Sequence, residues 1–138
     1  SALKVVLSGL YDTIGYYQPA SEEEQVMAKN WMDFLDIAEL KQQDFTRLSY
    51  GQQRLVLIAR AMVKSPNLLI LDEPCQGLDQ FNRKLVLNIV DQIALNTKTQ
   101  ILYVTHADAD KLICLDRELR FEADGEGGYH PIFYDITG

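Results

Sequence analysis

Apolar residues in the first half of the chain recur at intervals of three and four residues, which is the repeat of one helix face. The pattern predicts helices near residues 2–10, about 22–36 and about 50–63. The first half of the chain is therefore expected to be helical. The apolar faces of the three helices are marked in turn by Leu3, Val6, Leu7 and Leu10, by Met27, Trp31, Phe34, Leu35 and Ala38, and by Leu55, Ile58, Ala59 and Met62.

Two of these helices are preceded by a residue that can cap them. Ser21 is followed three residues later by Glu24, which is the pattern of a capping box. Ser49 stands directly before the third helix and can serve as its N-cap. Pro66 disfavours a helical residue before it, so the third helix is expected to end by Ser65.

Beyond residue 67 the pattern changes to short apolar runs. Residues 68–71 and 101–105 are apolar without alternation, as in strands that are buried on both faces of a parallel sheet. Helical periodicity returns between them, at residues 85–93. Residues 68–105 are therefore predicted to form a β-α-β unit with a right-handed crossover.

The end of the chain has the pattern of a hairpin. Two strands are predicted at residues 118–122 and 131–136, joined by a glycine-containing turn at residues 124–128. His130 has no partner at a catalytic spacing and is expected to be structural or solvated. Helices that alternate with strands place the chain in the α/β class.

Composition and charge exclude several classes of function. The chain carries 13 Lys and Arg against 20 Asp and Glu, a net charge of -7, which argues against direct nucleic-acid binding. No apolar run approaches the roughly 20 residues of a membrane-spanning helix. Cys75 and Cys114 lack metal-ligand spacing, and no basic-then-apolar leader begins the chain. We therefore expect a soluble protein in the reducing cytoplasm.

Polar residues stand where the two parallel strands are predicted to end. Asp72 and Glu73 follow the first strand, and His106 follows the second. Ligands of open α/β sheets bind beyond the carboxyl ends of the strands, so these side chains are expected to converge. Carboxylates suit a hard cation such as Mg²⁺, and the second acid can orient or deprotonate a water. Ordinary loop acids are the alternative explanation.

The start of the third helix is a second candidate site. Free backbone N–H groups at a helix N-terminus, together with the helix dipole, attract anions. Gly51 leaves room for the close approach of a phosphate, and Gln52 adds a neutral donor. Taken by itself, Ser49 is more simply explained as a cap without a ligand.

Four motifs occur in one order over residues 48–106. They are Leu-Ser-Tyr-Gly-Gln at 48–52, an apolar strand ending in Asp-Glu-Pro at 68–74, Gly-Leu-Asp at 77–79, and Val-Thr-His at 104–106. This order and spacing resembles the ATP-binding cassette (ABC) ATPases, in which the motifs are the signature, the Walker B strand, the D-loop and the switch histidine.

The resemblance implies a division of the chain. Residues 1–46 would be the end of the helical subdomain of an ABC ATPase. Residues 47–138 would be the signature helix and the C-terminal half of a core with a P-loop NTPase-type parallel sheet and flanking helices. No glycine is followed by Lys, so the phosphate-binding loop G-x-x-x-x-G-K-[ST] is absent. The chain is therefore expected to be a fragment that is inactive by itself.

The resemblance also implies a role for each candidate residue. Asp72 would hold Mg²⁺ through water, while Glu73 would polarise the attacking water and His106 would contact the γ-phosphate of ATP. Asp79 would lie at the interface with a second ABC ATPase domain, packed head to tail. The γ-phosphate of ATP held by that partner domain would be bound by Ser49, Gly51 and Gln52.

Two aromatic positions need separate comment. Tyr50 departs from the commonest family pattern, which has glycine there. Tyr16 and Tyr17 lie in the helical part and are not candidates for the aromatic that stacks on adenine. That aromatic and the glutamine loop lie upstream of residue 1 in the family.

Three stretches, at residues 5–9, 11–15 and 73–79, resemble one branch of the family more closely. That branch serves molybdenum transport and carries two ABC domains in one chain. The resemblance implies an ATP-hydrolysing subunit of a molybdate- or molybdenum-related system, cytoplasmic or peripheral on the inner face of the plasma membrane, with a membrane transport subunit as a further partner. Two alternatives are a non-catalytic interaction or regulatory module and an ABC ATPase of DNA repair or translation.

An unpaired sheet edge is a further expectation. In the family, the Walker A strand lies beside the strand at 101–105, on the side away from residues 68–71. Without that strand an apolar edge is left open, and open edges invite pairing with another chain. The chain is expected to self-associate or to cover this edge with its terminal segment.

Overall fold

The computed structural model describes residues 1–11 and 19–136. Residues 12–15 of the branch-like stretch, and Tyr16 and Tyr17, lie outside this part. Nowhere in the described ranges does a helix have the length and apolarity needed to cross a membrane. The helices are α1 (Ala2–Leu7), α2 (Glu22–Phe34), α3 (Tyr50–Met62) and α4 (Gln80–Asn96), the short 3-10 helices are Ser8–Leu10, Ala38–Leu40 and Phe45–Arg47, and the strands are β1 (Leu68–Asp72), β2 (Gln100–Val104), β3 (Arg117–Ala123) and β4 (Tyr129–Asp135).

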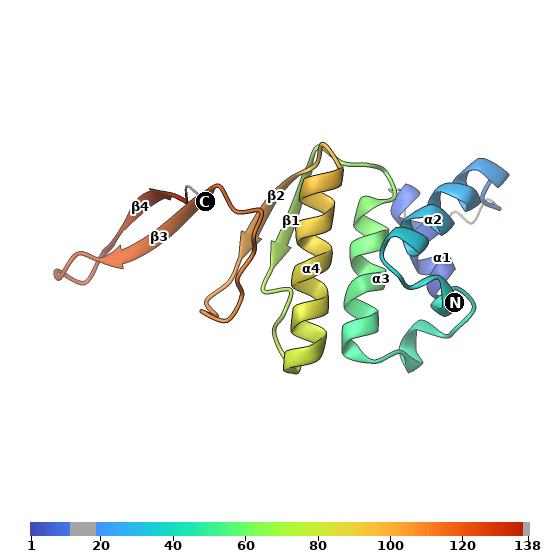
Figure 1. Ribbon diagram of the computed structural model, residues 1–138, viewed down its shortest axis with the longest axis horizontal. Coiled ribbons are helices and arrows are strands. Elements are labelled where there is room, and N and C mark those ends of the chain that lie inside the picture. The colour runs from blue at the N-terminus through green and yellow to red at the C-terminus, as the bar shows by residue number, and fades with distance from the viewer. Residues whose placement is uncertain (12–18, 137–138) are drawn as a thin grey trace.

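The three predicted N-terminal helices are present and pack together beside α4 (Figure 1). The capping box before α2 is confirmed. The Glu24 N–H donates to Ser21 Oγ at 3.2 Å, and the Ser21 N–H donates to a Glu24 carboxylate oxygen at 2.7 Å. These two bonds satisfy backbone donors that a helix start otherwise leaves free.

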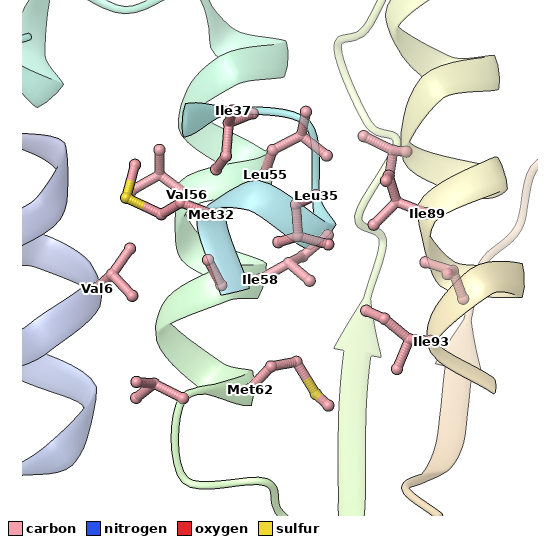
Figure 2. Packing of buried hydrophobic residues seen from close by; sticks show 14 of the residues in the cluster. Val6, Met32, Leu35, Ile37, Leu55, Val56, Ile58, Met62, Ile89 and Ile93 are labelled. Carbon is pink, nitrogen blue, oxygen red and sulfur yellow. The ribbon is translucent and has the colours of Figure 1, made fainter. Parts of the chain in front are cut away.

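The face that α2 buries is only in part the one its apolar pattern indicated. Ala28, Met32 and Leu35 are buried, whereas Met27 and Phe34 are 41% and 40% exposed. Figure 2 shows Met32 and Leu35 among the buried side chains of α3. Helix α2 carries apolar residues around more than one face, and packing against α1 and α3 decided which of them is covered.

The predicted β-α-β unit is present. Strands β1 and β2 pair in parallel, with Leu68 opposite Gln100 and Asp72 opposite Val104, and α4 connects them. Helices α3 and α4 lie on one side of these strands (Figure 1), and Leu69 and Leu71 join the common core.

Burial of these strands on both faces was wrong for the described part of the chain. Leu68 and Ile70 of β1 are 51% and 59% exposed, and Leu102 and Val104 of β2 are 51% and 44% exposed. The alternate side chains of a strand point to opposite faces, so the helices cover only one of the two. The other face is an apolar surface open to solvent.

The predicted C-terminal hairpin is also present. Strands β3 and β4 pair antiparallel, and the hairpin projects away from the helices and the parallel strands (Figure 1). It forms a sheet of its own, so within the described residues it does not cover the outer edge of β2. His130 is exposed on β4, as expected for a solvated histidine.

Candidate functional site

The carboxyl ends of β1 and β2 bring the predicted acids to one edge of the parallel sheet. Asp72 is the last residue of β1 and is exposed. Glu73 follows with a φ of 47°, a left-handed conformation that is uncommon for residues other than glycine. Its N–H donates to the Val104 carbonyl at 2.8 Å, which ties the turn after β1 to the end of β2.

Glu73 and His106 are in direct contact across this edge. One carboxylate oxygen of Glu73 accepts the backbone N–H of His106 at 3.0 Å and also contacts His106 Nδ1. The His106 side chain is 78% exposed and that of Glu73 is 24% exposed. The acid is thus partly shielded, while the imidazole remains accessible to a ligand.

A divalent cation fits this edge only together with a substrate. The described residues include no group of three or more His, Cys, Asp or Glu side chains that could hold a metal ion. Mg²⁺ is commonly held by one or two carboxylates, substrate phosphates and water. The exposed carboxylate of Asp72 suits that kind of coordination and does not suit a site built from protein ligands alone.

The start of α3 is a complete capping box. Ser49 Oγ accepts the Gln52 N–H at 3.3 Å, and the Gln52 side-chain oxygen accepts the Ser49 N–H at 3.0 Å. Capping, the simpler explanation of Ser49, is therefore observed. Tyr50, at the first position of the helix, is 80% exposed.

Gly51 lies against α4, for a reason that the sequence did not reveal. A Cβ at this position would lie 2.3 Å from Oδ1 of Asn82. Asp79 holds Asn82 in place, because its carboxylate accepts the Asn82 backbone N–H at 2.9 Å and the side-chain amide at 2.6 Å. The N-cap of α4 and the first turn of α3 are thus packed together within one chain, and the role of Gly51 towards phosphate stays a prediction.

The hydrogen bonds that Asp79 accepts favour its ionised form. The backbone N–H of Asn82, followed by its side-chain amide, lowers the pKa of Asp79. A charged carboxylate at the N-cap also suits the dipole of α4.

The two cysteines do not contribute nucleophiles to this edge. Cys75 is buried and Cys114 is half-buried, and neither forms a disulfide. Burial raises the pKa of the Cys75 thiol. Burial, followed by the carboxylate of Asp91, raises the pKa of Cys114 to about 12. Both thiols are protonated at neutral pH, and a protonated thiol is unreactive.

The model of the ABC transporter family matches residues 5–76. The chain belongs to this family.

The curated relatives of this ABC chain include ATP-binding proteins of molybdate and zinc import. It is 47% identical over 122 residues to the ABC transporter ATP-binding protein ModF of Escherichia coli, covering 88% of this chain and 25% of ModF. The molybdate import ATP-binding protein MolC of Haemophilus influenzae is 32% identical over 86% of this chain and 49% of its own length. The zinc import ATP-binding protein ZnuC of Buchnera aphidicola is 40% identical over 62% of this chain and 38% of its own length. The ABC chain therefore spans a quarter to about half of these relatives.

Solved structures support the fold. An ATP-binding cassette of an ABC transporter, MJ1267, aligns with a TM-score of 0.76 and 24% identity over 85% of this chain and 49% of its own length. A dimeric bacterial ABC transporter cassette, MJ0796, aligns with a TM-score of 0.70 and 22% identity over all of this chain and 57% of its own length. The α/β fold of an ABC cassette is confirmed.

A polar cluster around the buried side chain of Asp110 was not found by sequence reasoning. It consists of Arg83 on α4, Tyr103 on β2, and Thr105 and Asp110 in the loop after β2. Arg83 and Asp110 are 27 positions apart and are residue types usual at surfaces, so no local pattern of this ABC chain marks them as partners.

Proposed function

We propose that this chain supplies the hydrolytic part of one ATP site, and the part that acts on a partner's ATP, in an ABC transport protein. The contact between Glu73 and His106 at the carboxyl ends of adjacent parallel strands carries the proposal. Membership of the ABC transporter family supports ATP as the ligand. The site then contains an acid, an accessible imidazole and a second acid for the cation.

Each residue at the strand ends has a distinct task in this proposal. Glu73 orients the attacking water and accepts its proton, since positioning and electrostatics dominate phosphoryl transfer. Glu73 also holds His106 through Nδ1, which leaves Nε2 to contact the γ-phosphate. Mg²⁺, held by Asp72 through water, supplies charge neutralisation at the phosphates when it is bound.

The capping box of α3 is compatible with a phosphate contact. Ser49 Oγ accepts a hydrogen bond in the box, so its hydroxyl hydrogen remains as a donor. Gln52 uses its oxygen in the box, so its NH₂ group remains as a donor. We propose that these two donors and the backbone at Gly51 bind the γ-phosphate of ATP held by a second ABC ATPase domain, with Asp79 at the head-to-tail interface.

The relatives support metal-related transport as the broader class and molybdate as the narrower proposal. The molybdate import role of MolC favours the narrower proposal, while the relative ZnuC serves zinc import. The proposed partners are a second ABC domain in the same full-length chain and a membrane transport subunit. The proposed location is the cytoplasm, at the inner face of the plasma membrane. The isolated chain lacks a P-loop and is proposed to be inactive, with only very weak MgATP binding.

The test uses the full-length protein that contains this segment. Glu73→Gln removes the proton acceptor and His106→Ala removes the phosphate contact. We expect Glu73→Gln to lower kcat for ATP hydrolysis by about 10²- to 10⁴-fold, as for other general acid–base groups. We expect His106→Ala to lower it by about 10²- to 10³-fold, as for the loss of one donor to a developing charge. Glu126→Gln and His130→Ala, both exposed in the hairpin region, are matched controls that should retain the wild-type rate.

Two results would contradict this proposal in different ways. Wild-type hydrolysis in both Glu73→Gln and His106→Ala would show that the strand-end site is not hydrolytic. ATP-dependent association with a complete ABC domain, in the absence of any effect of these variants on hydrolysis, would favour the non-catalytic interaction module.

A further inference from the structure

The loop that carries His106 is joined to α4 by an ion pair whose carboxylate is buried. The Asp110 side chain is 2% exposed and forms an ion pair with Arg83 of α4, whose side chain is 22% exposed. The same carboxylate accepts hydrogen bonds from the Tyr103 hydroxyl and from Thr105 Oγ1, each at 2.9 Å. A buried carboxylate is tolerated where an opposite charge and hydrogen bonds satisfy it, as they do here.

The cluster reaches His106 through the hydroxyl of Thr105. Thr105 Oγ1 accepts the N–H of Ala107 at 3.0 Å, so one hydroxyl joins the two residues that flank His106. The loop is closed a second time, because the Asp110 N–H donates to the Ala107 carbonyl at 3.0 Å. These bonds fix the backbone on both sides of His106, whose own N–H donates to Glu73.

The pairing of the Asp110 carboxylate with Arg83 sets the direction of these hydrogen bonds. An ionised carboxylate only accepts, so the Thr105 hydroxyl hydrogen points to Asp110 and an oxygen lone pair is left for the Ala107 N–H. Burial, followed by hydrogen bonds to Cys75 and Asp110, raises the pKa of Tyr103, which keeps its hydroxyl a neutral donor. An amide at position 110 would present donors as well and would no longer impose this arrangement.

We propose that Asp110 and Arg83 are positioning residues that hold His106 on Glu73. The proposal rests on the proposed function, since it assigns a task to groups that touch neither ATP nor the attacking water. Asp110 fixes the loop, and Arg83 ties that loop to α4 through the ion pair. Glu73 and His106, which follow the two strands, are thereby aligned through an ion pair to α4.

The test compares kcat, KM for ATP and thermal stability in the full-length protein. In Asp110→Asn we expect kcat to fall about tenfold or more, because small misplacements of reacting groups are costly, while KM changes less than about twofold. Arg83→Lys keeps the positive charge and should retain more activity than Arg83→Met. Asp110→Asn leaves the charge of Arg83 without its ion-pair partner. The double variant Asp110→Asn with Arg83→Met removes that charge, so it should regain stability without regaining kcat.

The matched control is Asp91→Asn. Asp91 is also a buried carboxylate that holds a loop, because it accepts the N–H groups of Ile113 and Cys114, both at 2.9 Å. Among the described residues, its hydrogen bonds go to the loop at Ile113 and Cys114 and not to His106, so Asp91→Asn should lose stability while keeping kcat. The proposal is overturned if Asp110→Asn loses only stability, as Asp91→Asn does, or if the double variant regains kcat.

Amide exchange separates this proposal from the proposed function. Asp110→Asn should raise the hydrogen-exchange rate of the His106 N–H by about tenfold or more, whereas Asp91→Asn should not. If His106→Ala retains full hydrolysis, the proposed function fails, while the exchange result still tests the positioning of His106. Unchanged exchange of the His106 N–H in Asp110→Asn would overturn the positioning role by itself.

Discussion

At the scale of single residues, the acids and the histidine stand at the strand ends where the sequence placed them, whereas the groups that surround them were not predicted. The acids after β1 and the histidine after β2 follow from the rule that ligands bind beyond strand ends. The contact between Glu73 and His106 depends in addition on the left-handed backbone at Glu73. Nothing in the sequence around Glu73 requires that conformation.

Gly51 gives a prediction for a single residue, because Asn82 occupies the space that a Cβ at position 51 would need. Gly51→Ala places a methyl group 2.3 Å from Asn82 Oδ1, which Asp79 holds in place. We expect an overpacking loss of about 1 to 3 kcal/mol, reduced by the better helix propensity of alanine, about 1 kcal/mol. Denaturant unfolding measures the net change in the free energy of unfolding.

The control for this prediction is a double-mutant cycle. With Asn82→Ala already present, the side-chain amide is gone and only the Cβ of residue 82 remains, 3.0 Å from the added methyl group, so Gly51→Ala should cost less. An equal loss in the presence and absence of Asn82 would show that another contact requires the glycine.

At the scale of elements, local signals predicted helix starts well and helix faces less well. The capping boxes at Ser21 and Ser49 form because both partners lie within one turn, so the pattern contains the whole interaction. The buried face of α2 depends on its packing against α1 and α3. The pattern predicted Met27 on that face, whereas the structure buries the next residue, Ala28.

The capping box of α3 allows its structural and proposed functional roles to be separated. Ser49→Asp keeps an N-cap oxygen and a favourable charge for the helix dipole, so stability should be unchanged within about 0.5 kcal/mol. The same carboxylate would repel the γ-phosphate held by the partner domain. We expect ATP-dependent association of the two ABC domains within the full-length protein to be lost, so that the rise in sedimentation coefficient on adding ATP, measured by analytical ultracentrifugation, is absent.

Ser21→Asp is the matched control, since Ser21 forms the same box at the start of α2 and has no proposed phosphate contact. It should retain both stability and association. ATP-dependent association of Ser49→Asp at the wild-type level would mean that the start of α3 is a cap and nothing more.

At the scale of the whole molecule, the described residues leave a large apolar surface open. The exposed face of β1 and β2 includes Leu68, Ile70, Leu102 and Val104, and the outer edge of β2 has no paired strand in the described part of the chain. Exposed apolar faces and open edges both favour association.

We therefore expect the 138-residue chain to self-associate. Light scattering over a concentration series should show species larger than a monomer. Ile70 is 59% exposed, so Ile70→Lys puts a charge on the open apolar face of β1 and β2 and should weaken association without unfolding the chain. Lys64→Arg, which keeps the charge at an exposed position, should leave association unchanged. A monodisperse monomer at all concentrations would contradict the expectation.

The sequence by itself determined the order of helices and strands, the capping boxes and the residue types at the strand ends. These depend on residues within a few positions of one another or on a motif order that is visible along the chain. Only the tertiary structure decided the buried face of α2, the approach of Asn82 to Gly51 and the pairing of Arg83 with Asp110. Each of these joins residues that the fold brings together from distant parts of the chain, and packing, burial and charge pairing act on that proximity in space.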